Sequence, residues 1–102
     1  MMKGFGDMLK QAQKMKRDFD VLQERLADER FEASAGGGMV RVVVDGKQML
    51  KELKLDPALL AEKDVTMIED LVLTAVGEAQ RASETKMHEA LKKLTGGMPL
   101  PF

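Results

Sequence analysis

Residues 31–55 read FEASAGGGMVRVVVDGKQMLKELKL, and this stretch decides the fold class. Apolar and polar residues alternate along 31–35, a glycine triplet follows at 36–38, and the two-residue period then returns with Val40, Val42 and Val44. A period of two that is rich in β-branched residues is typical of strands. The stretch therefore predicts a three-stranded antiparallel meander with strands at about 31–35, 39–45 and 47–55.

Short turn signals separate these strands from each other and from the next element of the chain. Asp45-Gly46 predicts a type I′ hairpin turn between the second and third strands, because glycine tolerates the positive φ that this turn requires. Asp56-Pro57 ends the third strand, and Pro57–Leu60 are expected to form a short helical turn with proline at its first position.

Upstream of the strands the apolar period is that of a helix. Apolar residues recur from Phe5 to Leu26 at alternating spacings of three and four, which is a heptad pattern. We expect a helix over about 7–30 with Asp7 as its N-cap. So narrow a stripe favours a dimer or helix packing seam over a ligand groove. The seam consists of Met8, Ala12, Met15, Phe19, Leu22 and Leu26.

Downstream of the strands a second long helix is expected over about 64–95. Asp64 and Thr66 are alternative N-caps, the latter in a capping box with Glu69. Its apolar face is broad only as far as Ser83, so the first half is expected to cover the sheet and the second half to project from it. Gly96-Gly97 end the helix, and residues 96–102 form a short tail with two prolines. The predicted fold is α+β, with the order α-β-β-β-α in a single domain over 1–102.

Composition excludes several classes of function. The 102 residues contain no Cys and one His, His88, so neither a thiolate metal site nor a nucleophile–base pair can be assembled. We therefore expect no enzyme, no cofactor, no metal and no small-molecule substrate. The sequence contains no secretory signal and no apolar run that approaches the ~20 residues needed to cross a bilayer. A cytoplasmic protein without a membrane partner is expected.

The formal net charge of −1 conceals a strong sorting of charge along the chain. Residues 1–17 hold five basic residues against one acidic residue, and residues 81–94 hold four against two. Between them, residues 18–32 and residues 64–80 each carry a net charge of −4, and residues 33–63 carry +1. The basic residues therefore lie at the start of the first long helix and at the end of the second.

If the two long helices are antiparallel, their basic ends lie together as a tip that binds an anion. Lys10, Lys14 and Arg17 follow one line on the helix face opposite the packing seam. The alternative is an ordinary solvated face, since lysines near a helix C-terminus already complement its dipole. The tip hypothesis assigns the anion contacts to Lys10, Lys14, Arg17, Arg81, Lys86, Lys92 and Lys93, with Lys3 and Lys16 as further candidates.

Several segments, taken in order, resemble the YbaB/EbfC family of bacterial nucleoid-associated proteins. They include MLKQAQKM at 8–15, VRVVVDG at 40–46 after the glycine cluster, LDPALL at 55–60, EDLV at 69–72 and the GGMP of the tail. The resemblance implies a homodimer whose sheets associate and whose long helices project like tweezers. It also implies binding to double-stranded DNA with little or modest sequence preference, in the nucleoid, with a role in its organisation and in gene expression.

Two other functions stay open at the level of sequence. One alternative is a protein-interaction adaptor whose projecting helices bind a protein partner. The other is an accessory subunit of an enzyme. Salt dependence discriminates between these alternatives, because binding through phosphates weakens steeply as salt rises. With no Trp or Tyr and four Phe, few side chains are available for stacking on bases, so single strands should bind no better than duplex.

Overall fold

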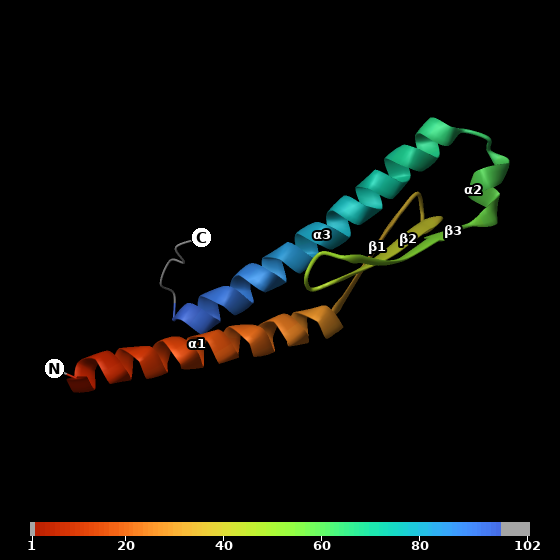
Figure 1. Cartoon of the computed structure of the whole chain (residues 1–102). Coiled ribbons are helices and arrows are strands. Elements are labelled where there is room, and N and C mark those ends of the chain that lie inside the picture. The colour runs from red at the N-terminus through yellow and green to blue at the C-terminus, as the bar shows by residue number, and fades with distance from the viewer. Residues whose placement is uncertain (1, 97–102) are drawn as a thin grey trace.

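The structure is a computed structural model that describes residues 2–96 of the chain, with side chains from Gly4 onward. Its elements follow the order α-β-β-β-α that the sequence predicts, with a short additional helix before the last long one (Figure 1). The molecule is elongated, 73 × 21 × 16 Å. The elements are α1 (Met2–Asp28), β1 (Arg30–Ala35), β2 (Val40–Asp45), β3 (Leu50–Leu55), α2 (Pro57–Ala61) and α3 (Val65–Thr95).

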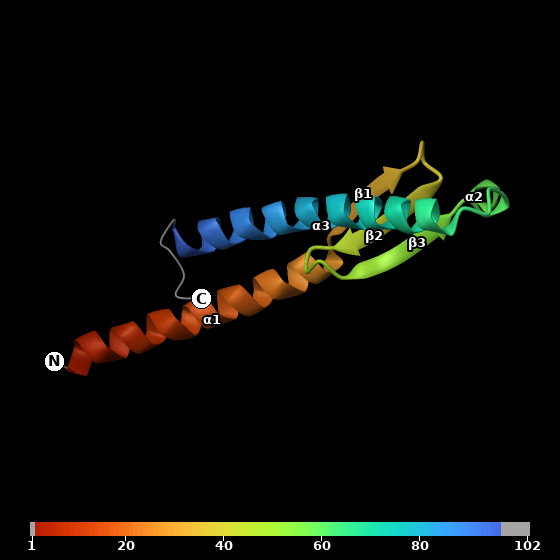
Figure 2. The same cartoon turned by 90° about the horizontal axis from the view of Figure 1, so that it is seen from above.

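The sheet is an antiparallel meander in the order β1-β2-β3, and one of its faces is covered by α3. In the central strand Val40, Val42 and Val44 are fully buried, because they alternate toward the helix-covered face. Small side chains on α3, Ala75 and Ala79, allow the helix to approach them closely. Figure 2 shows α3 crossing the sheet, and this crossing forms the apolar core of the molecule.

The prediction of a type I′ turn between β2 and β3 is wrong. Gln48, not Gly46, has a positive φ, of 67°. Asp45 N donates to Met49 O at 2.9 Å and Gln48 N donates to Asp45 O at 3.1 Å, which makes a three-residue loop over 46–48. The third strand therefore begins at Leu50 and not at residue 47.

The helix ends correct one predicted cap and decide another. Asp7 is not an N-cap, because α1 begins at Met2 and continues through Gly4 and Gly6. Each glycine lowers helix stability by only about 1 kcal/mol, which does not stop a helix that nothing else interrupts. At α3, Asp64 and not Thr66 is the N-cap, since its carboxylate accepts from Met67 N at 3.0 Å.

The other ends agree closely with the sequence signals. Asp56 caps α2 by accepting from Ala58 N at 2.9 Å, and Pro57 occupies the first turn as expected. Gly96 ends α3 in the left-handed conformation, with a φ of 65°. The rest of the predicted tail, residues 97–102, lies outside the described residues.

Two helical segments project from the sheet in the same general direction. We call residues 26–83 the body, residues 4–18 of α1 the α1 arm, and residues 84–95 of α3 the α3 arm. The helices are antiparallel and converge away from the sheet, as Figure 1 shows. The prediction that α3 projects beyond Ser83 is confirmed, since Ser83 is the last buried residue of that helix.

Candidate nucleic-acid interface

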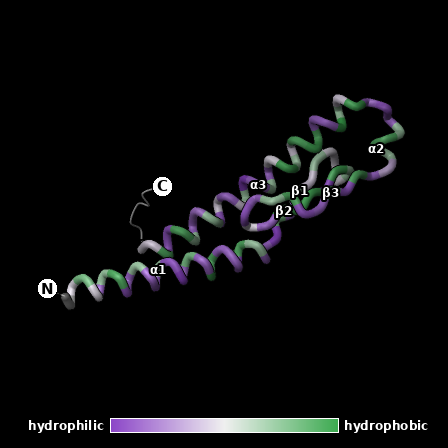
Figure 3. The backbone as a smooth tube through the Cα atoms, viewed as in Figure 1, coloured by the Kyte–Doolittle hydropathy of each residue, from purple (hydrophilic) through white to green (hydrophobic). Residues whose placement is uncertain are grey.

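The predicted packing seam of α1 is occupied at one end and open at the other. Leu26 is 1% exposed, and Leu22 and Phe19 are half-buried. Farther from the body Met15 is 47% exposed and Met8 is 69% exposed, and Ala12 between them is also exposed. Hydrophilic and hydrophobic residues alternate along this part of α1 in Figure 3. No described residue of the same chain covers this part of the seam.

The two basic helix ends converge without coinciding. The last turns of α3 face the middle of α1 across a groove lined by Asp18, Val21, Leu22, Arg25, Ala90, Lys93 and Leu94. The groove thus places Lys93 beside the acidic segment of α1, while Lys10 and Lys14 lie farther out. The two-helix basic tip that the sequence predicts is therefore not formed within one chain.

The basic ends of α1 and α3 lie at different distances from the body because the two helices project from it by different lengths. From the buried Leu26 the helix α1 runs outward for 24 residues to Met2, which is about 36 Å. From the buried Ser83 the helix α3 runs outward for only 12 residues to Thr95, which is about 18 Å. The α1 arm thus extends well beyond the end of α3 (Figure 1).

The basic residues of the α1 arm are all exposed. Lys10, Lys14 and Arg17 follow one helix line, Lys16 lies off that line, and none of the four is in an ion pair with a described residue. The side chain of Lys3, a further candidate, lies outside the described ones. The structure thus assembles three of the predicted contacts into one continuous basic stripe.

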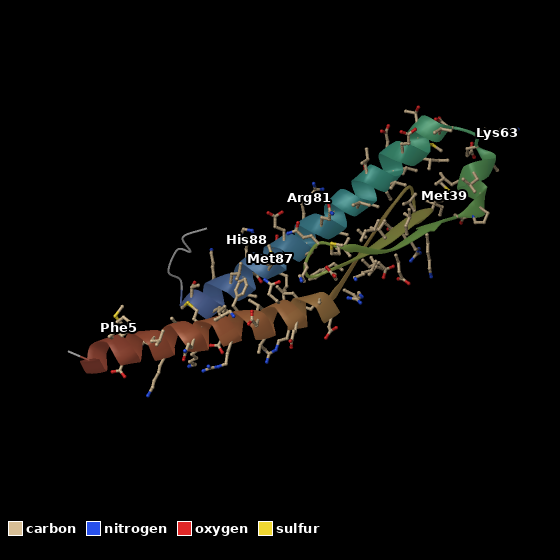
Figure 4. All side chains as sticks on the ribbon, viewed as in Figure 1. Phe5, Met39, Lys63, Arg81, Met87 and His88 are labelled. Atoms are coloured by element: carbon tan, nitrogen blue, oxygen red, sulfur yellow. The ribbon has the colours of Figure 1, made fainter. Side chains whose placement is uncertain are left out.

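The basic residues of α3 divide between two faces. Lys86 and Lys93 are seven residues apart and so share a face, and Lys93 lines the groove toward α1. Arg81 and His88 lie on the side of α3 turned away from α1 in Figure 4, and Lys92 is one turn beyond His88. His88 is exposed, and its Nε2 lies 3.6 Å from Oε1 of Glu84. The seven predicted contacts therefore form three groups.

Sequence reasoning missed the role of the turn between β2 and β3, to which both long helices are hydrogen-bonded. Asp45 is 2% exposed, and its carboxylate accepts from Lys47 N at 2.8 Å and Met49 N at 3.0 Å. Burial alone would raise the pKa of this carboxyl, but the two backbone hydrogen bonds, with Lys51 and Arg30 nearby, lower the pKa below its usual value. The sequence signal for this contact was Ser83, the one polar residue in the apolar line of α3, whose hydroxyl donates to Asp45 O.

Sequence reasoning also missed an uncovered apolar area on β3. Met49, Leu50 and Leu53 are 59%, 45% and 46% exposed, although Leu53 pairs with the fully buried Val42. A helix about 10 Å wide covers about two strands spaced 4.8 Å apart, and α3 lies over β1 and β2. The third strand keeps its apolar side open.

The described residues include neither a membrane-spanning helix nor a cluster of metal-binding side chains. Within residues 2–96 no helix is long and apolar enough to span a bilayer. The same residues hold no cluster of three His, Asp or Glu side chains placed to bind a metal ion.

Comparison with known proteins gives one consistent result. The model of the YbaB/EbfC DNA-binding family matches residues 2–98. A nucleoid-associated protein of Acetivibrio thermocellus is 43% identical over 99 residues, which cover 93% of this chain and 88% of that protein. Another nucleoid-associated protein, from Gemmatimonas aurantiaca, is also 43% identical, and the match covers 93% of this chain and 91% of that protein. The crystal structure of an uncharacterized protein from Helicobacter pylori superposes with a TM-score of 0.84 at 26% identity, covering 90% of this chain and 97% of that one.

Proposed function

Since the chain belongs to the YbaB/EbfC DNA-binding family, we propose that it binds double-stranded DNA as a homodimer with little or modest sequence preference. The single observation that carries this proposal is the exposed basic stripe on an arm that extends beyond the end of α3. The names of its relatives place those proteins in the nucleoid. By extension we assign this chain to the nucleoid of the cytoplasm, with effects on DNA organisation and gene expression.

The stripe has dimensions suited to a DNA backbone. From Lys10 to Arg17 the helix rises about 10 Å, and duplex DNA presents one phosphate per 3.4 Å of axis on each strand. The stripe thus spans about three phosphate intervals of one strand, so its three cations can each meet a phosphate of that strand. Contacts from Lys and Arg to phosphates position a protein but carry no base information, which accounts for a modest sequence preference.

The sorted charge confines the contact to the arms. The segments 18–32 and 64–80, each with a net charge of −4, lie at the base of α1 and along the first half of α3. These acidic residues repel a duplex that approaches the body, because like charges disfavour the alternative docking positions. Among the described regions the α1 arm then has the most favourable field.

The homodimer is supported by the apolar surface that one chain leaves open. Leu50 and Leu53 on β3 continue the core face of the sheet beyond the cover of α3. A second copy placed against this half of the sheet would bury it and would leave the arms projecting as tweezers. Sedimentation of the protein at micromolar concentration as a species near its monomer mass of 11.3 kDa would exclude this assembly.

A salt titration of binding to random duplex DNA tests the proposal. With about six phosphate contacts per dimer, the logarithm of the association constant should fall against the logarithm of salt concentration with a slope near −5. Single-stranded DNA of the same length serves as the control and should bind no better, because the chain lacks stacking aromatics. A weak affinity that is flat in salt would overturn the proposal.

A protein-interaction adaptor is the second candidate, and one observation favours it. Phe5, Met8 and Met15 form an apolar line on the α1 arm, with Phe5 71% exposed. Apolar residues at this spacing are typical of a helix that packs against another helix. A weak duplex affinity with a flat salt dependence is the result that this function predicts.

A further inference from the structure

The α1 arm is attached to the body at a single place. Leu26 is buried, and its carbonyl oxygen accepts from Gly46 N at 2.7 Å. Residues 7–18 are all exposed, so contacts farther out along α1 do not hold the helix in position. The direction of the arm is therefore set in the last turns of α1, where Leu26 meets the loop between β2 and β3 and where Leu22 lines the groove toward α3.

The other long helix is attached to the same loop. Ser83 is fully buried, and its hydroxyl donates to Asp45 O at 2.7 Å. One turn earlier Gln80 Nε2 donates to Gln48 O at 3.2 Å. Residues 45–49, which we call the anchor turn, thus hold α1 through a backbone N–H and α3 through two carbonyl oxygens.

The anchor turn is itself held rigidly. The Asp45 carboxylate binds the N–H groups of Lys47 and Met49, and Lys51 Nζ lies 3.7 Å from its second oxygen. Both ends of the loop are also joined by the backbone bond from Asp45 N to Met49 O. Buried and fully bonded polar groups of this kind fix one conformation, because every alternative leaves a donor or acceptor without a partner.

No free space separates the anchor turn from α1. A Cβ atom added at Gly46 would lie 2.5 Å from Leu26 O and 2.9 Å from Leu26 Cα. Both of these atoms belong to the backbone, so relief requires movement of the helix itself and not of a side chain. Glycine is needed here for close approach, since Gly46 has no positive φ.

We propose that the anchor turn is the positioning element of the DNA-binding arms, and that it sets the direction of the α1 arm relative to α3. This inference rests on the proposed function for its consequence, not for its geometry. Lys10 lies 16 residues from Leu26, about 24 Å along a rigid rod. A small tilt at the anchor turn therefore displaces the basic stripe by several times the local movement.

The experiment measures the distance between the arms directly. Because the chain has no Cys, a pair of spin labels can be placed on one chain at the exposed positions Gln13→Cys and Thr85→Cys. Dilution with an excess of unlabelled chain leaves one labelled chain per dimer. In a Gly46→Ala background we expect the mean distance to shift by about 3 Å or more, or the distribution to broaden, from the lever length of α1.

Gly77→Ala is the matched control. A Cβ at Gly77, in the middle of α3, would meet Arg81 Nη1 at 3.7 Å, which is an ordinary contact. The same substitution there should leave the distance distribution unchanged. Duplex affinity should fall by about tenfold in Gly46→Ala, as expected when one or two phosphate contacts are lost, and stay unchanged in Gly77→Ala.

A second variant keeps the test decisive if Gly46→Ala does not fold. Ser83→Ala removes one hydroxyl and leaves a residue that favours helix, so α3 is retained while its bond to Asp45 is lost. A folded Gly46→Ala or Ser83→Ala protein with the wild-type distance distribution would overturn the proposal. Because the distances are measured without DNA, a wild-type protein that failed to bind DNA would overturn the proposed function alone.

Discussion

The body and the α1 arm place the same kinds of residue in opposite environments. In the body Val42 is fully buried and the charged Asp45 is enclosed with its hydrogen bonds satisfied. In the α1 arm Met8 and Met15 lie largely in solvent beside lysines that face no acidic partner among the described residues. The fold is thus determined by the body, and the sequence of the arm is left free to serve contacts with another molecule.

This division has a thermodynamic consequence. An isolated helix of about 12–15 residues is marginal in water, so the α1 arm persists as the continuation of a helix whose other end is packed. Substitutions in the body should change the free energy of unfolding, whereas substitutions in the arm should change binding and leave global stability nearly constant.

The largest effect on stability is expected from Leu59→Ala. Leu59, on α2, is fully buried in the core cluster that also contains the valines of β2, and truncation of a buried leucine destabilises by about 2–5 kcal/mol through lost burial and a cavity. Leu60→Ala is the matched control, because Leu60 is the next residue and is 59% exposed. Urea denaturation should show a lower midpoint for the first variant only, and equal losses for both would contradict the assigned core.

The largest effect on binding is expected from reversing the basic stripe. Lys10→Glu, Lys14→Glu and Arg17→Glu together should weaken duplex binding by at least about 100-fold, because the phosphate contacts become repulsive. Reversal of Arg41, Lys54 and Lys63, which are exposed and lie outside the anchor turn, changes the net charge of the chain equally and is the control. Gel shift measures binding, and sedimentation should show the same oligomer in both variants. Binding retained by the first triple variant would exclude the stripe as the contact.

The third prediction concerns pH and the anchor turn. Because its hydrogen bonds keep the pKa of Asp45 below the unfolded value, this carboxylate contributes stability that is present at neutral pH and is lost as pH falls through its folded-state pKa. The free energy of unfolding should therefore fall on acidification below about pH 4, and Asp45→Asn should be less stable at pH 7 with a shallower acid slope.

Asp20→Asn is the comparison for this titration. Asp20 is exposed on α1 and its carboxylate accepts no hydrogen bond from a described residue, so its replacement removes no hydrogen bond from the described part of the fold. Denaturation midpoints from pH 7 to 3 measure both variants. Identical acid slopes in wild type and Asp45→Asn would contradict the role given to this carboxylate.

The elements of the fold could be predicted because their signals are local. The two-residue period at Val40–Val44, the proline at 57 and the glycine at 96 each act within a few residues, and the structure contains the strand, helix and cap that they indicate. The errors concern tertiary placement. Gly46 marked a turn correctly, but its need for space against Leu26 depends on a contact 20 residues away in the chain.

The candidate site shows the same limit. Charge sorting identified Lys10, Lys14 and Arg17 as one stripe, and spacing alone was sufficient for this because they share a helix. Whether they meet Lys92 and Lys93 depends on where α1 and α3 are anchored, and no local pattern reports that Leu26 and Ser83 meet the same turn. The basic tip of one chain was mispredicted for this reason.

The smallest effect is expected from Gly6→Ala, which makes the same chemical change as Gly46→Ala in the opposite environment. Nothing lies within 4 Å of a Cβ built at Gly6, and the residue is helical with no positive φ. Alanine should therefore stabilise the α1 arm by up to about 1 kcal/mol. Amide hydrogen exchange in residues 4–18 should slow, while the urea midpoint of the body stays constant, because the arm opens independently of global unfolding. A loss of stability in Gly6→Ala would mean that a second copy of the chain approaches Gly6 closely, and the α1 arm would then be part of the dimer interface and not a free arm.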